Sequence, residues 1–425
     1  MVKLSPLALI FIAACFSRIL HLTVLSGLSK ALPLFDTSPS LLLPSPPPSL
    51  RWDAIHFSSI AYNGYEYEQQ VAFQPGWLAV MRLAGEGVRF IRAASVVELK
   101  DVILGSTIMA NFAFVAATLV LYKLTKHIFN PTFALLTSLL YLLPPTATPS
   151  APYTEPIYSL LTFSGIYLLS IKRQMVLAGL CFAGATTVRS TGIFNLITLT
   201  CFAVFGDAHM LDLSDKDYAK RMTRKTWKHY LPALLVVAPF IMFQYYCETV
   251  FCTRESKLAN SARPWCSNSP PVSYGFVQKL YWNVGPFEYW TLAQLPNIAL
   301  AMPILSFSLV GFVKYFSHLV SSSQVLNHGT GEKPPPPILF ELYSVHLLTM
   351  ALLLFTSHTQ IALRVCLGDP VVWWNAVKLG FDNVEMDEGR KRHVKMNKFG
   401  RYWVGWTVVW GAIAAVLWAG HYPPA

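Results

Sequence analysis

Long apolar segments, separated by short polar or charged stretches, recur along the whole chain. A membrane-spanning helix needs about 17–25 mostly apolar residues, and runs of this kind predict ten crossings. They lie at 4–26, 102–122, 132–149, 157–171, 175–188, 191–206, 230–247, 292–316, 338–358 and 403–421. A weaker eleventh crossing is predicted at 361–381, where Arg364 and Asp369 interrupt the apolar run. The pattern therefore predicts an all-α polytopic membrane protein with about ten to eleven transmembrane helices.

Basic residues gather in short loops between these segments and predict the orientation of the chain. Cytosolic loops of membrane proteins carry an excess of Lys and Arg, so the clusters at 123–127, 172–173, 216–228 and 390–401 are expected in the cytosol. The predicted long cytosolic loops are 206–229 and 317–337. Alternation then places the polar loops 27–101 and 248–291 on the opposite side, and it favours eleven crossings over ten.

The first apolar segment is expected to remain as a helix, because Arg18 and His21 interrupt it and no A-x-A cleavage site follows. An arginine inside an apolar span either pairs within the bundle or extends to the membrane surface. Both interpretations of Arg18 stay open from the sequence.

The composition agrees with a membrane protein. Apolar residues make up 54% of the chain and charged residues 13%, against about 25% charged in soluble domains. The net charge of +11 is interpreted as orientation and not as nucleic-acid binding, because the basic residues lie between the spans. No polar stretch approaches the roughly 100 residues of a nucleotide-binding domain. We therefore expect one membrane-embedded domain over 1–425 and no soluble nucleotide-linked donor.

Known short motifs add little to this picture. The sequence contains no P-loop, GxGxxG, HExxH or GxSxG pattern. Asp215 and Asp217 match the D-x-D pattern of nucleotide-sugar transferases, but they lie in a charged loop predicted to be cytosolic. A solvated loop is the favoured interpretation.

A polar island at 51–76, directly after the first span, contains the best candidate for catalysis. Asp53 follows Arg51 and Trp52, and the same loop contains His56, Glu68 and Gln74. A carboxylate at the boundary of the membrane can take the proton of an attacking hydroxyl. Asp53 is the predicted base and Glu68 the second candidate.

Three arginines and one glutamate could complete the site. A guanidinium group binds phosphate oxygens through two parallel hydrogen bonds, so Arg51, Arg189 and Arg364 are candidates for a leaving phosphate. Contact with lipid headgroups is the alternative for each arginine. Glu155 is a candidate for substrate binding, with capping of the following helix as the alternative.

A second polar island, at 264–297, combines aromatic rings with amides. Trp282 and its neighbouring rings suit a sugar, although aromatic residues also line the membrane interface without any ligand. Asn283, Gln294 and Asn297 need hydrogen-bond partners, and sugar hydroxyls are suitable ones. Cys252 and Cys266 could form a disulfide in an oxidising compartment or remain as two thiols.

Five short segments resemble the GPI mannosyltransferase 2 family (PIG-V type) in their order and spacing. They are Arg51-Trp-Asp with His56, Tyr153-Thr-Glu-Pro, Arg189-Ser-Thr-Gly, Tyr281-Trp-Asn-Val-Gly with Gln294, and His358-Thr-Gln with Arg364. The resemblance extends over most of the chain.

The resemblance implies a glycosyltransferase C-like enzyme of the endoplasmic-reticulum membrane. Such an enzyme adds the second mannose, in α-1,6 linkage, to the glycosylphosphatidylinositol (GPI) precursor, and takes it from dolichol-phosphate mannose on the luminal side. The class inverts the anomeric centre by direct displacement, with the acid of the first luminal loop as base, which maps to Asp53. No cofactor is certain, metal dependence stays open, and a small membrane accessory subunit is a possible partner. The predicted substrate-binding residues are Arg51, Trp52, His56, Gln74, Glu155, Arg189, Trp282, Asn283, Gln294, Asn297, His358, Gln360 and Arg364.

Two other functions are compatible with many apolar spans. A transporter of lipids or lipid-linked sugars would use polar residues near the membrane midplane, and a non-catalytic scaffold of a GPI-synthesis complex would need no base. The substitution Asp53→Asn separates them from an enzyme, because it should abolish only transfer.

Overall fold

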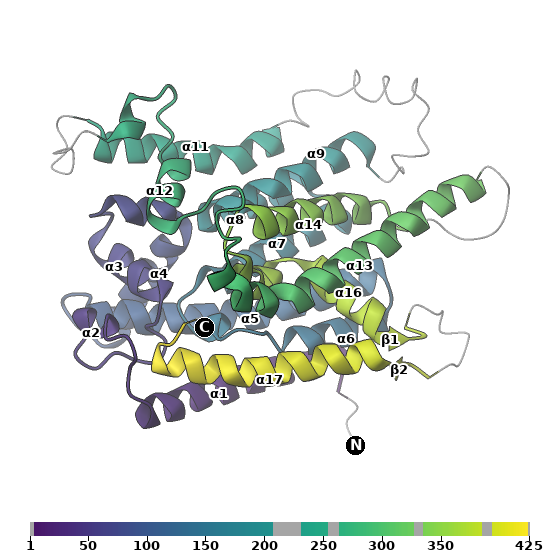
Figure 1. The fold of residues 1–425 in the computed structure, drawn as a ribbon, viewed down its shortest axis with the longest axis horizontal. Helices are drawn as coiled ribbons and strands as arrows, with labels where there is room; N and C mark the ends of the chain where they lie inside the picture. Colours follow the sequence, from purple (N-terminus) through teal and green to yellow (C-terminus); the bar gives the residue numbers. More distant parts are fainter. Residues whose placement is uncertain (1–3, 207–230, 254–262, 327–334, 385–392, 424–425) are drawn as a thin grey trace.

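The computed structural model describes residues 4–206, 231–253, 263–326, 335–384 and 393–423 as an elongated helical bundle (Figure 1). Within these described ranges, six helices are long and apolar enough to cross a membrane. These are α1 (Pro6–Ala31), α5 (Leu99–Ile128), α11 (Leu231–Phe251), α13 (Leu295–Leu326), α14 (Ile338–Phe355) and α17 (Lys398–Gly420). The chain is therefore a multi-pass membrane protein.

Shorter helices lie between the long ones. The helices α6 (Pro131–Tyr141), α7 (Thr154–Ser170), α8 (Met175–Val188) and α9 (Asn195–Phe205) occupy segments predicted to cross the membrane. The predicted helix at 132–149 ends early, at Tyr141, because Pro144 and Pro145 follow and proline has no N–H to continue a helix. A 3-10 turn, η2 (Thr148–Ser150), ends that segment.

The weak crossing predicted at 361–381 is not one continuous helix. It is broken into η8 (Thr359–Ile361), α15 (Ala362–Val365), η9 (Cys366–Gly368) and α16 (Pro370–Gly380). Non-helical backbone at membrane depth is tolerated where protein surrounds it, and this segment is largely buried. The break places Arg364 and Asp369 inside the bundle.

The loop predicted at 27–101 is mostly helical. It contains α2 (Pro39–Leu42), α3 (Asp53–Asn63), η1 (Glu68–Ala72) and α4 (Pro75–Ile91). The second polar island forms η6 (Pro264–Ser267), α12 (Ser273–Trp282) and η7 (Leu292–Gln294), while η3 (Ser190–Phe194) joins α8 to α9. Both polar islands therefore contain regular helical structure, and they lie at the end of the bundle that carries α2, α3 and α12 (Figure 1).

At the opposite end of the bundle, a short two-stranded sheet and one side-chain hydrogen bond connect the ends of α6, α16 and α17. Strands β1 (Phe381–Asp382) and β2 (Lys395–Met396) pair antiparallel between α16 and α17, and Asn130 Nδ2 donates to the carbonyl oxygen of Val384 over 2.8 Å. The Asp215 and Asp217 pattern and the whole basic loop at 216–228 lie outside the described residues.

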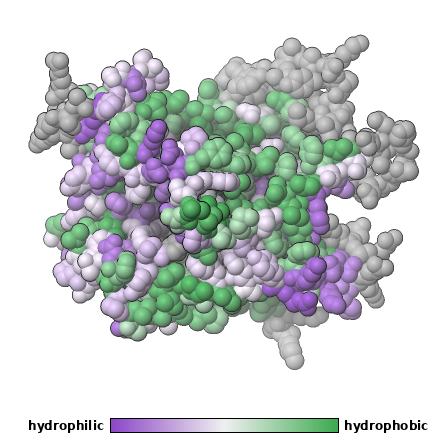
Figure 2. Space-filling model, in the orientation of Figure 1, coloured by the Kyte–Doolittle hydropathy of each residue, from purple (hydrophilic) through white to green (hydrophobic). Residues whose placement is uncertain are grey.

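A broad apolar surface lies between these two ends (Figure 2). On α13, Leu309, Val313 and Phe316 are exposed, and Val409 is exposed on α17. Apolar side chains of this kind suit the hydrocarbon region of a bilayer. Arg18 does not extend to this surface. It is buried, donates to Ser150 Oγ over 3.2 Å and lies over the Phe114 ring.

Helices α4 and α5 approach each other closely at glycines. A Cβ atom on Gly105 would lie 2.5 Å from the carbonyl oxygen of Ala84, and one on Gly85 would lie 2.9 Å from Cα of Val102. Both contacts involve backbone and cannot be relieved by a side-chain rotation. This contact fixes α4, and with it the segment that carries Gln74.

We expect Gly105→Ala to destabilise the protein by about 1–3 kcal/mol, because overpacking forces the two helices apart. The midpoint of thermal unfolding in detergent measures the effect. Gly87→Ala, on α4, is the control because a Cβ there meets nothing within 4 Å and alanine favours helix. Equal midpoints for the two variants would contradict the helix contact.

Candidate active site

Asp53 is the first residue of α3 and is held from two sides. Its backbone N–H donates to the Tyr153 hydroxyl over 2.9 Å. The residue before it, Trp52, has φ of +53°, and its N–H donates to His421 Nε2 over 3.2 Å. Positive φ is strained for a bulky residue and persists only where its surroundings hold it. The contacts that hold Trp52 therefore also fix the backbone of the next residue, Asp53, and the direction in which its carboxylate leaves the chain.

A chain of alternating charges connects Asp53 to the ends of α7 and α8. Arg364 Nη2 lies 2.9 Å from Asp53 Oδ2 and Arg364 Nε lies 3.0 Å from Glu155 Oε1. Arg189 Nη1 contacts the same Glu155 oxygen at 2.8 Å. Two arginines and two carboxylates therefore compensate each other, as buried charges require.

Tyr153 and Thr154, at the start of α7, order this chain. The Arg364 guanidinium lies 5.0 Å from the centre of the Tyr153 ring, within the range of a cation–π contact. Thr154 Oγ1 accepts from Arg189 Nη1 over 2.9 Å. The carboxylate and both guanidinium groups thus have few alternative positions.

These groups line a cavity of about 770 Å³, a size typical of small-molecule sites. Its apolar walls come from Phe57, Phe73, Val188, Ile193, Phe194, Phe240, Leu352, Leu353 and Ile361. Its polar lining includes Asp53, Gln74, Thr154, Arg189, Ser190, Thr191, Tyr274, Gln278, His358, Gln360 and Arg364. A charged group and an apolar chain can therefore be bound side by side.

Several residues that line this cavity have buried polar atoms without a hydrogen-bond partner among the described residues. These atoms are Nε1 of Trp52 and Trp282, and both the oxygen and nitrogen of the Gln74 amide. Gln74 is 4% exposed. A buried amide without partners costs about 1–3 kcal/mol, and hydroxyl groups of a ligand would remove that cost.

Eight of the predicted site residues line the cavity: Trp52, Asp53, Gln74, Arg189, Trp282, His358, Gln360 and Arg364. His358 Nε2 contacts the carbonyl oxygen of Trp282 over 2.7 Å, and Gln360 Oε1 accepts from the Tyr289 hydroxyl over 3.1 Å. The first and last motifs of the sequence thus meet in one site.

Arg51 does not reach the cavity. Its guanidinium donates to the carbonyl oxygens of Pro47, Leu50 and Ala419 at 2.8–3.4 Å. Burial lowers the pKa of Arg51 to about 10, so it stays charged near neutral pH. Its partners are backbone carbonyl oxygens, and Arg51 is not among the residues that line the cavity, so the structure separates it from the other two candidate arginines.

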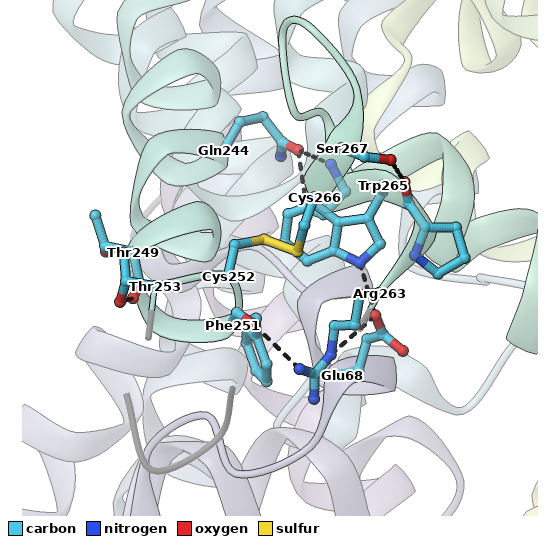
Figure 3. The surroundings of a disulfide bond; sticks show 12 residues. Glu68, Gln244, Thr249, Phe251, Cys252, Thr253, Arg263, Trp265, Cys266 and Ser267 are labelled. Carbon is cyan, nitrogen blue, oxygen red and sulfur yellow. Dashed lines mark hydrogen bonds and ion pairs between the residues drawn. A yellow bond between two sulfur atoms is a disulfide. The ribbon is translucent and has the colours of Figure 1, made fainter. Parts of the chain in front are cut away.

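Glu68 is not among the cavity-lining residues and instead contacts the second island (Figure 3). Glu68 Oε1 accepts from Trp265 Nε1 over 2.6 Å and lies 3.2 Å from Arg263 Nε. Its Oε2 accepts from the Tyr281 hydroxyl over 2.7 Å. The loop beside it contains a Cys252–Cys266 disulfide. Glu68 therefore links η1 to the disulfide loop, and both of its oxygens are occupied.

Five further predicted residues lie outside the cavity lining. Glu155 does not line the cavity but pairs with Arg189 and Arg364, which do. The His56 ring stacks on the Phe73 ring, with their centres 5.6 Å apart. Burial lowers the pKa of His56, with Asp53 opposing the shift. The other three are in the second island, where Asn283 ends α12 with φ of +49° and Asn297 donates to Gln294 over 2.7 Å.

Sequence reasoning missed several lining residues, namely Thr154, Ser190, Thr191, Tyr274 and Gln278. Thr154, Ser190 and Thr191 belong to the quoted motifs, but a hydroxyl on an apolar helix usually bonds its own backbone. No group of three or more His, Cys, Asp or Glu side chains that could bind a metal occurs in the part of the chain that the structure describes.

Residues 43–425 match the family model described as Mannosyltransferase (PIG-V). GPI mannosyltransferase 2 of Cryptococcus neoformans var. neoformans serotype D is 86% identical over 425 residues, which cover 100% of both chains. GPI alpha-1,6-mannosyltransferase 2 of Cricetulus griseus is 33% identical over 76% of this chain and 71% of that protein.

Among solved structures, the Archaeoglobus fulgidus oligosaccharyltransferase tethered to an acceptor peptide matches with a TM-score of 0.48 and 14% identity. The match covers 97% of this chain and 56% of that one, so this chain spans about half the length of that enzyme. A likeness of this strength does not establish a shared fold. The family match and the relatives over the full chain place the protein in the Mannosyltransferase (PIG-V) family of membrane glycosyltransferases.

Proposed function

We propose that this chain transfers mannose from dolichol-phosphate mannose to a GPI precursor, in α-1,6 linkage, on the luminal side of the endoplasmic-reticulum membrane. The observation that carries the proposal is the meeting of Asp53, Arg189 and Arg364 in one cavity with apolar walls. A lipid-linked sugar phosphate has three parts that complement this lining. Its hydroxylated ring suits polar side chains, its anion suits the arginines, and its isoprenoid chain suits the apolar walls. The names of the relatives support mannose and a GPI acceptor.

Asp53 is the proposed general base. Its Oδ2 is paired with Arg364, and no described residue forms a hydrogen bond with its Oδ1. In the proposed step, Asp53 takes the proton of the acceptor hydroxyl while the hydroxyl oxygen attacks C1 of mannose. The bond from C1 to the phosphate oxygen breaks, and dolichol phosphate leaves with the electron pair. One displacement inverts the anomeric centre, so a β-linked donor gives an α-linked product.

Arg189 and Arg364 are the proposed groups for the leaving phosphate. Both guanidinium groups line the cavity, and Glu155 holds them from behind. Charge that develops on the phosphate during transfer is stabilised best by groups that do not have to move. The apolar side of the cavity, with Phe194, Phe240 and Leu352, suits the isoprenoid chain.

We expect Gln74→Leu to raise KM by about tenfold while leaving the thermal midpoint equal or higher. The amide has no partner among the residues that the structure describes, so the substitution removes a buried polar group and none of their hydrogen bonds. Transfer assays over a range of acceptor and donor concentrations measure KM. A large loss of stability with unchanged KM would show that Gln74 supports the fold instead of binding sugar.

We also propose that the end of the bundle that carries the site faces the lumen. A disulfide between Cys252 and Cys266 is typical of an oxidising compartment such as the lumen. It lies at the end of the bundle that carries Asp53. Eleven crossings, a glycosyltransferase C-like fold and a small accessory subunit remain part of what we propose.

The test is a transfer assay with membranes from cells that lack their own second GPI mannosyltransferase. Membranes containing this chain are given dolichol-phosphate mannose and a GPI precursor with one mannose. The expected product carries two mannoses and is sensitive to an α-1,6-specific mannosidase. Absence of product from well-expressed protein would contradict the proposal, and lipid movement without transfer would favour the transporter.

A further inference from the structure

The segment at 419–423, which comprises the last residues of α17 and the three that follow, is fixed against the start of α3. The carbonyl oxygen of Gly420 accepts from Phe35 N–H over 2.8 Å, and the ring of Tyr422 stacks on Phe35 at 4.8 Å. Ala419 offers its carbonyl oxygen to Arg51, and Pro423 lines the cavity. Residues almost 370 positions apart in sequence therefore form one wall of the site.

His421 is the centre of this contact and is 1% exposed. Its Nε2 lies 3.2 Å from the Trp52 backbone nitrogen, and its Nδ1 lies 3.0 Å from the carbonyl oxygen of Asp36. The first partner is a donor and the second an acceptor, so the two contacts assign a neutral ring with the proton on Nδ1. The ring also meets the Trp52 indole edge-on at 4.5 Å.

Trp52 needs such a partner because of its backbone. Its φ of +53° is a conformation that a bulky residue keeps only where its surroundings fix it. The next residue is Asp53, the proposed base, whose own N–H is held by Tyr153. Without the acceptor at Nε2, Trp52 can relax toward negative φ and rotate the Asp53 peptide away from the cavity.

We propose that His421 is a positioning residue for catalysis, which holds Trp52 in its strained conformation and so aims the Asp53 carboxylate at the acceptor hydroxyl. The inference rests on the proposed function, because it takes Asp53 as the base. His421 is not among the residues that line the cavity. It acts through the Trp52 backbone alone.

The same contacts make the positioning dependent on pH. The charged groups that face His421 are Asp36 and Arg51. Burial lowers the pKa of His421, Arg51 adds to the shift, and Asp36 opposes it. Protonation would place a second N–H against the N–H of Trp52. The positioning is therefore present above the pKa of the folded protein and is lost as the pH falls through it.

The experiment compares His421→Ala and His421→Gln with the parent, using the full chain in membranes or detergent. Glutamine can accept from Trp52 and donate to Asp36, as the neutral imidazole does, but it does not titrate. We expect His421→Ala to lower kcat about tenfold, the effect of one lost hydrogen bond, with little change in KM. His421→Gln should recover most of kcat and should remove the contribution of His421 to the acidic limb of the pH profile.

The matched control is Tyr422→Ala, which loosens the same segment without touching Trp52. We expect kcat within about twofold of the parent there. An equal loss in Tyr422→Ala and His421→Ala would overturn the inference, because it would indicate general loosening. An equal loss in His421→Gln and His421→Ala would also overturn it, because packing and not the hydrogen bond would then matter.

Hydrogen exchange of the peptide that covers 51–63 gives a second readout that needs no activity. Exchange at the start of α3 should be faster in His421→Ala than in the parent and should return to the parental rate in His421→Gln. If the parent transfers no mannose, the proposed function fails while this measurement still decides whether His421 holds Trp52. Unchanged exchange in His421→Ala would refute the positioning role.

Discussion

Asp53→Asn is expected to lower kcat by about 10²–10⁴-fold, the usual contribution of a general base. The amide has nearly the same shape and can still accept from Arg364 through its oxygen, but it cannot take a proton from the acceptor hydroxyl. Little loss of stability is expected, because the Asp53 side chain is 24% exposed to the cavity. Initial rates of transfer at saturating substrate, with protein amounts matched by blotting, measure the effect.

Glu68→Gln is the comparison that tests the choice of base. The Glu68 oxygens bond Trp265 and Tyr281 outside the cavity, so kcat should fall far less than in Asp53→Asn. The unfolding midpoint should fall instead, because Arg263 in the disulfide loop loses its ion pair with Glu68. If Glu68→Gln lowered kcat as much as Asp53→Asn does, the choice of Asp53 over Glu68 as the base would be wrong.

The second large effect concerns Glu155→Gln, which we expect to destabilise the protein by about 3–5 kcal/mol. Glu155 is buried between Arg189 and Arg364. A neutral amide leaves these two guanidinium groups without their shared counter-ion, and they repel each other at the cavity wall. The midpoint of thermal unfolding in detergent should fall, and transfer should fall with it because the arginines are displaced.

Glu86→Gln is the matched control for this prediction. Glu86 also contacts two arginines, Arg82 at 3.2 Å and Arg89 at 2.7 Å, but on the exposed face of α4. Solvent screens such pairs, and each contributes only about 0–1 kcal/mol. Similar midpoints for Glu86→Gln and Glu155→Gln would mean that the buried chain of charges does not support the site.

Much of the site was predictable because its chemistry is carried by unusual residues. Asp53, Arg189 and Arg364 are charged groups next to apolar spans, where ionised side chains are rarely present without a role. The sequence could therefore select them one at a time. It could not select between Arg51 and the other arginines, because all three have the same chemistry and only their partners differ.

Periodicity and length likewise predicted the long helices well and the short ones less accurately. Apolar runs such as 102–122 continue as one helix, α5. The predicted helix at 132–149 and crossing at 361–381 are broken, since proline and buried charges change the backbone within an apolar run. Helix α4 lies in a segment predicted to be loop, because its apolar residues form a stripe at helical spacing and not the long apolar run that indicates a membrane span.

The sequence by itself determined that this chain is a multi-pass membrane protein and that Asp53 is its best candidate base, because composition, hydropathy and residue type are local properties. The tertiary structure decided that Asp53 lies 2.9 Å from Arg364, that Glu68 and Arg51 face other partners, and that His421 holds Trp52. These facts depend on distances between residues up to about 370 positions apart. Only the packing of the helices fixes such distances. In a bilayer this packing rests on van der Waals contact and hydrogen bonds between helices, which form without regard to the order of the helices in the chain.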